Sequence, residues 1–223
     1  MGKTKDTAKA IGKADRDATH HAARHRDAPA IKATGFLAEI ADQPQLITLS
    51  IATALIGLFA RKPALARGGA RMLAAHLAAT GVKSAIKHSI DRTRPARAIE
   101  DGAHRFEPGH SGDHELNSFP SGHTAGAVAV SRAIARDMPG AAAPAALATV
   151  AVAAAQPVNG SHYFSDLVAG AAVGWATEAL VSAVFDRLVP VIDEAVPALP
   201  GRDGPDGRLQ APVQPGAGLR DAR

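Results

Sequence analysis

We predict an all-α fold, a bundle of about five helices embedded in a membrane, from three observations. The chain of 223 residues is 46% hydrophobic but only 4% aromatic, so Ala, Val, Leu and Ile must build its core. Residues 43–60 carry no charged side chain over 18 positions, which is just long enough for a helix to span a bilayer. No stretch shows the alternation of apolar and polar residues that is typical of a half-buried strand.

Five segments are expected to be helical because each is rich in apolar or small residues and ends near a turn signal: residues 43–60, 67–89, 124–138, 141–156 and 163–188. The runs 43–60 and 141–156 suit a bilayer best. A polar, Gly- and His-rich loop is expected over residues 96–119. Small residues such as Gly170 and Gly174 should let the last helix approach its neighbours closely.

Two terminal segments flank the helical domain, which we place at residues 34–196. Residues 1–33 hold eight Lys or Arg against four acids and have no apolar face wide enough to bury, so we expect a solvated or surface-lying helix. Residues 197–223 are rich in Gly and Pro and are predicted to be disordered. The net charge of +4 comes from the N-terminal segment, which argues against a nucleic-acid partner, because such a protein carries its basic surface on the folded domain.

Cysteine is absent from the sequence, which excludes disulfides, thiolate zinc sites and cysteine nucleophiles. His20, His21 and His25 include the i, i+4 spacing of metal ligands, but no carboxylate stands at a matching spacing, so a polar helix face is expected there. The N-terminus is charged throughout, with no apolar stretch of secretory-signal length. The protein therefore either stays in the cytoplasm or is inserted into a membrane by a later segment, and we expect a bacterial inner membrane.

Polar residues that suit phosphate binding lie where helices are predicted to end or begin. Lys87 and Arg94 place two cations near one helix terminus, and a guanidinium matches the geometry of phosphate oxygens. Residues 120–123 form a tight turn that opens the next helix, where backbone N–H groups bind anions.

Two histidines complete this set. His123 and His162 can supply a proton donor and a nucleophile near neutral pH. Asp166 follows His162 by four residues, on the same helical face, so its carboxylate can hold one ring nitrogen and leave the other free to attack. The residues thus indicate phosphoryl transfer through a phosphohistidine, without a metal ion.

These residues form three motifs in chain order: Lys87-x6-Arg94-Pro95, Pro120-Ser121-Gly122-His123 and His162-x3-Asp166. Together they resemble the three-part signature of the type 2 phosphatidic acid phosphatase superfamily. That superfamily includes bacterial acid phosphatases and vanadium haloperoxidases. The resemblance covers about residues 45–188 and implies an α-helical bundle with its site where helix ends meet. It implies that His162 is the nucleophile, Asp166 its orienting partner and His123 the general acid, without a cofactor. The phosphoryl oxygens would be held by four residues: Lys87, Arg94, Ser121 and Gly122.

One motif position departs from the superfamily pattern. Its third motif normally begins Ser-Arg, where this chain has Ala155 and Gln156. Losing one cationic contact to a transition-state phosphoryl group costs roughly 2–4 kcal/mol, so we expect weakened or retuned activity, with the Gln156 amide as a hydrogen-bond donor in place of the arginine. Several residues are candidates to replace the missing charge: Arg92, Arg97, Arg105, His88, His104, His110 and His114.

The leading prediction is an integral membrane phosphatase that hydrolyses a lipid phosphate or pyrophosphate, with membrane lipids around it. The superfamily resemblance implies phosphatidate, phosphatidylglycerol phosphate or a polyprenyl pyrophosphate as substrate, and the residues do not choose among them. Two alternatives stay open: a soluble phosphatase of the same superfamily, and a catalytically weakened membrane protein that binds anions or lipid headgroups, which Gln156 favours. The facing of the site and the oligomeric state are not determined by the sequence.

Overall fold

The computed structural model describes residues 2–29, 31, 35 and 41–195. The chain divides into two compact units, residues 1–186 and 187–223, and the first contains every element that bears on the site. The tail predicted to be disordered, residues 197–223, lies outside the described residues. That prediction, and the domain boundary near residue 34, stay predictions.

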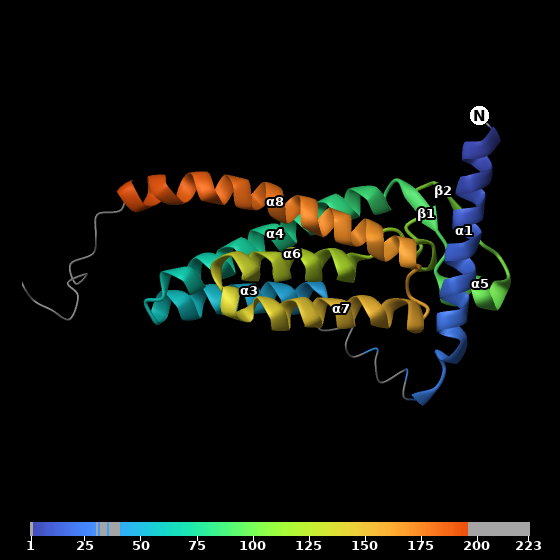
Figure 1. The fold of residues 1–223 in the computed structure, drawn as a ribbon, viewed down its shortest axis with the longest axis horizontal. Coiled ribbons are helices and arrows are strands. Elements are labelled where there is room, and N and C mark those ends of the chain that lie inside the picture. Colours follow the sequence, from blue (N-terminus) through green and yellow to red (C-terminus); the bar gives the residue numbers. More distant parts are fainter. Residues whose placement is uncertain (1, 30, 32–34, 36–40, 196–223) are drawn as a thin grey trace, which may run out of the picture. The chain divides into compact units, whose positions relative to one another are not determined.

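Five long helices form the bundle (Figure 1). They are α3 (Gln43–Phe59), α4 (Pro63–Lys87), α6 (Gly122–Asp137), α7 (Ala142–Val158) and α8 (Phe164–Ala195). Helix α4 packs against α3 and α6, and α6 also packs against α7. The prediction of an all-α bundle is confirmed, and each of the five predicted helices is present.

Small side chains set the spacing between these helices. A Cβ atom on Gly170 would lie 2.4 Å from the carbonyl oxygen of Ser121, and one on Gly174 would lie 2.3 Å from that of Ala125. Such distances exclude any larger residue, so glycine is what allows α8 to lie this close to α6. The close approach predicted from the sequence is therefore observed, and it brings the start of α8 to the start of α6.

The segment between α4 and α6 is more ordered than the sequence predicts. Strands β1 (Ile90–Arg92) and β2 (Phe106–Pro108) pair antiparallel, and the short helix α5 (Pro95–Asp101) lies between them in the chain. The prediction of a plain loop over residues 96–119, with no strand anywhere, is wrong. Strands of three residues are too short to show alternation, and a helix of about two turns shows no apolar period.

Helix α1 (Gly2–Ala22) lies across the end of the bundle that carries β1 and β2 (Figure 1). A helix was predicted here, but the prediction that it has no face to bury is wrong for its second half. Thr19 is fully buried, as is Ala23 in the following 3-10 turn η1 (Ala23–His25), and the side chain of Asp15 is only 10% exposed. The buried face consists of small and polar side chains, which leave no hydrophobic periodicity in the sequence.

Several of the charges that interrupt the apolar runs pair between helices. Both arginines of α6 bond to the fully buried carboxylate of Glu178 on α8, Arg132 Nε at 2.8 Å and Arg136 Nε at 2.5 Å. Arg71 on α4 donates to Asp137 at 2.7 Å. A buried carboxylate is tolerated only when it is paired in this way, so these charges belong to the bundle.

Candidate active site

A cavity of about 370 Å³ opens at the end of the bundle where α4 ends and α6 begins. Five of the seven predicted site residues line it: Lys87, Arg94, Gly122, His123 and His162. The other two, Ser121 and Asp166, are fully buried next to it. The fold therefore brings together residues from three segments that lie far apart in the sequence.

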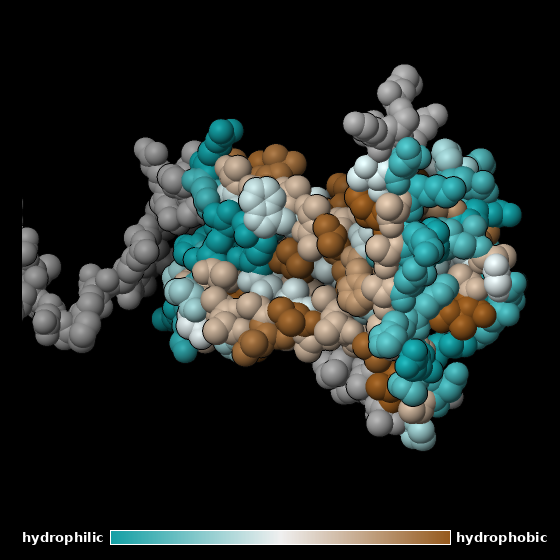
Figure 2. All heavy atoms as spheres, turned by 45° about the vertical axis from the view of Figure 1, so that its right-hand side comes forward, coloured by the Kyte–Doolittle hydropathy of each residue, from teal (hydrophilic) through white to brown (hydrophobic). Residues whose placement is uncertain are grey.

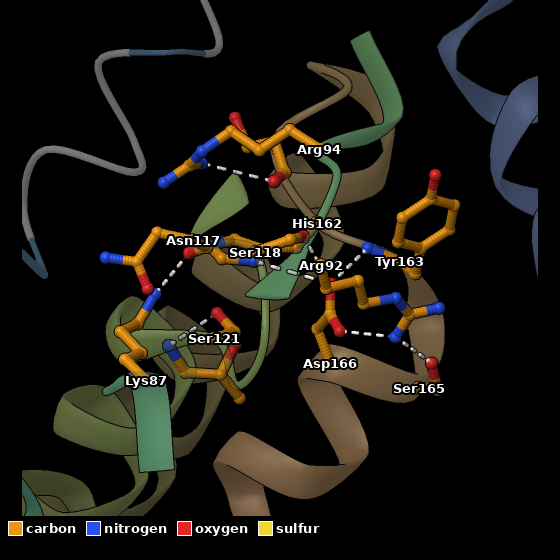
Figure 3. Close-up of polar contacts among 12 residues, drawn as sticks. Lys87, Arg92, Arg94, Asn117, Ser118, Ser121, His162, Tyr163, Ser165 and Asp166 are labelled. Carbon is orange, nitrogen blue, oxygen red and sulfur yellow. Dashed lines mark hydrogen bonds and ion pairs between the residues drawn. The ribbon is translucent and has the colours of Figure 1, made fainter. Parts of the chain in front are cut away.

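His162 precedes α8, and Asp166 lies in the first turn of that helix. The Nδ1 atom of His162 is 3.6 Å from Oδ2 of Asp166, which leaves Nε2 for a substrate. The same carboxylate oxygen accepts hydrogen bonds from the Ser118 hydroxyl at 2.7 Å and from the Tyr163 backbone N–H at 2.9 Å (Figure 3). The separation of 3.6 Å is longer than a hydrogen bond, and contacts of this kind often tighten when substrate binds.

The surroundings of His162 keep its ring neutral. Burial lowers the pKa of His162 to about 4, and the cations Arg94 and Lys87 act in the same direction against the opposing effect of Asp166. A neutral imidazole retains the lone pair that a nucleophile needs. With this pKa, the ring of His162 is neutral near neutral pH.

His123 faces His162, with ring centroids 6.3 Å apart. Its Nε2 lies 2.6 Å from Oδ1 of Asp42, the residue that precedes α3. Burial lowers the pKa of His123 below its usual value, while Asp42 raises it. Asp42 was not predicted from the sequence, and it favours the protonated form of His123 that a general acid requires.

Lys87 and Arg94 point their charged groups toward backbone carbonyls at the rim of the cavity. Lys87 Nζ donates to the Asn117 carbonyl at 2.5 Å, and Arg94 Nη1 donates to the Ser161 carbonyl at 3.2 Å (Figure 3). Burial lowers the pKa of Lys87 to about 7, with Arg94 adding to the effect. An anion in the cavity would reverse this shift, because a nearby negative charge favours the ammonium form.

A third cation, Lys83, was missed by the sequence analysis. It lines the cavity, and its Nζ would lie 3.0 Å from a Cβ atom built on Gly122, at the start of α6. His76 and Thr80 also line the cavity from α4. The signal was present in the sequence, since Thr80, Lys83 and Lys87 are spaced three and four residues apart and so share one helix face.

Ser121 and Gly122 open α6 in different roles. The Ser121 hydroxyl accepts the backbone N–H of Thr124 at 3.3 Å, and its own N–H donates to the Asp166 carbonyl at 3.0 Å. Ser121 is thus the N-cap of α6 and lies beside the cavity without lining it, so phosphate binding by its hydroxyl stays a prediction. Gly122 does line the cavity, and the first N–H groups of α6 have no partner within the helix.

Gln156 does not take the place of the motif arginine in this cavity. Its side chain is 1% exposed, and its amide donates to the Val152 carbonyl at 3.3 Å, within α7. Its backbone carbonyl accepts N–H groups from Ser161 and His162. The expectation that its side-chain amide points to phosphate is therefore wrong, because the amide is used inside the helix.

Most candidate substitutes for that arginine are engaged elsewhere. Arg92 bonds to Asp166, Arg97 to Asp101, and Arg105 to Glu107. Of the four candidate histidines, His114 is the one that lines the described part of the cavity, and its Nε2 lies 3.3 Å from Arg94 Nη2. The additional cation of the cavity is Lys83 instead.

No three His, Asp or Glu side chains in the described part of the chain are arranged to hold a metal ion. The expectation of metal-independent chemistry stays a prediction.

Comparisons with known proteins agree with this fold. The family model described as the PAP2 superfamily matches residues 68–190. The crystal structure of LpxE from Aquifex aeolicus superposes with a TM-score of 0.57 at 19% identity, covering 75% of this chain and 93% of that one. A transmembrane PAP2-type phosphatidylglycerolphosphate phosphatase from Bacillus subtilis gives a TM-score of 0.54 at 16% identity, covering 85% and 89%. No curated protein sequence matches the chain.

Proposed function

Because the chain belongs to the PAP2 superfamily, which includes phosphatases, we propose that it hydrolyses a lipid phosphate or pyrophosphate through a phosphohistidine at His162. The observation that carries the proposal is a neutral, buried His162 in a cavity lined by cations. Asp166 lies on one side of its ring, and His123 faces it. A site that only bound anions would need the cations but neither histidine.

The reaction proceeds in two steps. Nε2 of His162 attacks the phosphorus atom, the bond to the leaving oxygen breaks, and His123 donates its proton to that oxygen. In the second step His123 takes a proton from water, the resulting hydroxide attacks phosphorus, and the P–N bond breaks to release phosphate. Asp166 stabilises the positive charge that develops on the ring of His162.

The cations stabilise the charge on the transferring phosphoryl group. Lys87, Arg94 and the N-terminus of α6 line the same cavity as the two histidines, and Lys83 lies beside Gly122. Fixed positive groups in a partly dry cavity stabilise an equatorial phosphoryl charge more strongly than water does. This arrangement supports activity despite the neutral side chain at position 156.

Membrane embedding is supported by the surfaces of α7 and α8. The stretches Pro139–Val158 and Phe164–Leu188 are long and apolar enough to cross a membrane, and 22% and 28% of an apolar 18-residue window in each are buried. Large apolar side chains such as Leu147 and Val168 are each 71% exposed. On the face shown in Figure 2, apolar side chains cover the middle of the bundle between more polar ends. A surface of this kind is what lipid tails would cover.

An apolar groove favours a lipid over a water-soluble ester as substrate. Ala41 lines the catalytic cavity and also lines a second cavity, of about 130 Å³, between α3, α6 and α7. That second cavity is walled by apolar residues, including Leu46, Val130 and Val152. A substrate with its phosphate near His162 could extend a hydrocarbon chain in this direction.

The test is phosphate release from a panel of lipid phosphates and pyrophosphates, in detergent with EDTA. Release by the wild-type protein that survives EDTA and is lost in His162→Ala supports the proposal. His88→Ala is the matched control, because His88 is exposed and does not line the cavity. Release that needs a divalent metal ion, or that persists in His162→Ala, would overturn it, and silence of the wild-type protein would favour an anion-binding role.

A further inference from the structure

The carboxylate of Asp15, on α1, lies against the start of α8. Its Oδ2 accepts hydrogen bonds from Arg92 Nη2 at 2.8 Å and from the Ser165 hydroxyl at 2.5 Å. Its Oδ1 accepts the Ser165 backbone N–H at 3.1 Å. With 10% of its side chain exposed, this carboxylate is held in one position by three hydrogen bonds.

Arg92 connects this carboxylate to the catalytic pair. Its Nη1 donates to Asp166 Oδ1 at 2.5 Å and to the Ser165 hydroxyl at 2.7 Å (Figure 3). The guanidinium also lies over two aromatic rings, 4.1 Å from the centroid of Tyr163 and 4.8 Å from that of Phe106. A planar cation with these contacts has little freedom to rotate.

The balance of charges indicates what the second carboxylate, Asp15, contributes to this network. A guanidinium paired with Asp166 alone would cancel the negative charge that Asp166 offers to His162. Asp15 adds one negative charge on the far side of Arg92, so the chain Asp15–Arg92–Asp166 carries a net charge of −1. Asp166 then keeps its capacity to stabilise the ring of His162 as that ring becomes positive.

Helix α1 lies outside the family match, which begins at residue 68. We propose that Asp15 is a positioning residue for His162, acting through Arg92 and Asp166, so that α1 is part of the active site. This inference rests on the proposed role of His162 as the nucleophile.

The experiment compares Asp15→Asn with Asp17→Asn. Both variants remove one charge from α1, but Asp17 is 66% exposed and pairs with Lys13 in solvent. We expect the single-turnover rate of phosphohistidine formation to fall about tenfold in Asp15→Asn and to stay unchanged in Asp17→Asn, because a buried charge-assisted contact is lost only in the first. Inhibition by inorganic phosphate should be unchanged in both, since the phosphate-binding cations are intact. Asp15→Glu, which keeps the charge, should recover most of the rate.

A second readout does not depend on phosphatase activity. Diethyl pyrocarbonate acylates neutral imidazoles, and mass spectrometry can follow its reaction with individual histidines. The reaction of His162 should slow in Asp15→Asn, while that of the exposed His88 stays the same. If the wild-type protein released no phosphate but this slowing occurred, the proposed function would fail, while the positioning of the His162 ring by Asp15 would stand.

Two results overturn the inference while leaving the proposed function intact. One is an active protein in which Asp15→Asn matches Asp17→Asn in both readouts. The other is a parallel loss of rate and phosphate affinity, which would indicate general disorder of the site. If Asp15→Asn does not fold, Ser165→Ala removes one hydroxyl contact of Asp15 and should slow phosphohistidine formation about threefold, and an unchanged rate there also counts against the inference.

Discussion

Replacing Asp42 by Asn should move the alkaline limb of the pH–rate profile to lower pH. His123 must be protonated to serve as the general acid, and the Asp42 carboxylate favours that form through a contact of 2.6 Å. Because burial lowers the pKa of His123, we expect loss of the proton from His123 to set this limb. Protonation of His162, with a pKa of about 4, sets the acidic limb, so activity should peak in mildly acid solution.

The size of the shift follows from the exposure of the pair. A hydrogen bond to a charged group contributes about 1.5–3 kcal/mol, and the lower end applies because Asp42 is 43% and His123 29% exposed. About 1.4 kcal/mol corresponds to one pKa unit, so the alkaline limb should fall by about one pH unit. On that limb the rate should drop about tenfold, while at a pH where His123 is protonated in both proteins it should change little.

The assay is kcat/KM for phosphate release between pH 3 and 9, roughly the range that brackets both limbs. Glu107→Gln is the control, because it removes a carboxylate from an exposed position outside the cavity. Inorganic phosphate should also inhibit Asp42→Asn more tightly, since one negative charge has left the cavity. An unchanged limb, or an equal loss of rate at every pH, would refute the role assigned to Asp42.

Three further predictions concern binding and packing. Lys83→Met should raise KM about tenfold with a smaller change in kcat, whereas Lys62→Met, at the α3–α4 turn, should leave the kinetics unchanged. Gln156→Leu should retain kcat/KM, and its free energy of unfolding by denaturant should fall by at most about 1 kcal/mol, because the Gln156 amide bonds within α7. A large loss of activity would contradict this geometry. Gly174→Ala should destabilise the fold by about 1–3 kcal/mol, because its new Cβ atom would overlap a carbonyl oxygen of α6. Gly81→Ala, where nothing lies within 4 Å, should stabilise the fold by about 0.5–1 kcal/mol. Thermal unfolding that ranks the two variants in the opposite order would disprove the packing argument.

The helices could be predicted because their signals are local. Apolar runs and breakers such as Pro63 and Pro139 fix where each helix begins and ends, and the structure follows them closely. The segment between α4 and α6 could not be predicted in the same way. Its strands depend on pairing between Ile90 and Pro108, which lie 18 residues apart and show no periodic pattern.

Part of the site could be predicted and part could not. His162 and Asp166 are four residues apart, so their proximity follows from the sequence, although His162 lies just before α8 and only Asp166 lies on the helix. Lys83 could have been found from its spacing to Lys87, but nothing in the sequence shows that Gln156 turns its amide back into α7.

The candidate reactive groups follow from the sequence by itself, because residue type fixes which groups are present and helix geometry fixes their local spacing. Only the tertiary structure decided which distant groups reach them. Asp42 meets His123 across 81 residues of chain, and Asp15 meets Arg92 across 77. Such contacts depend on how α1 and α3 pack, and packing arises from the shapes of many side chains together. A polar residue whose partner lies in another helix therefore looks the same in the sequence as one that faces solvent.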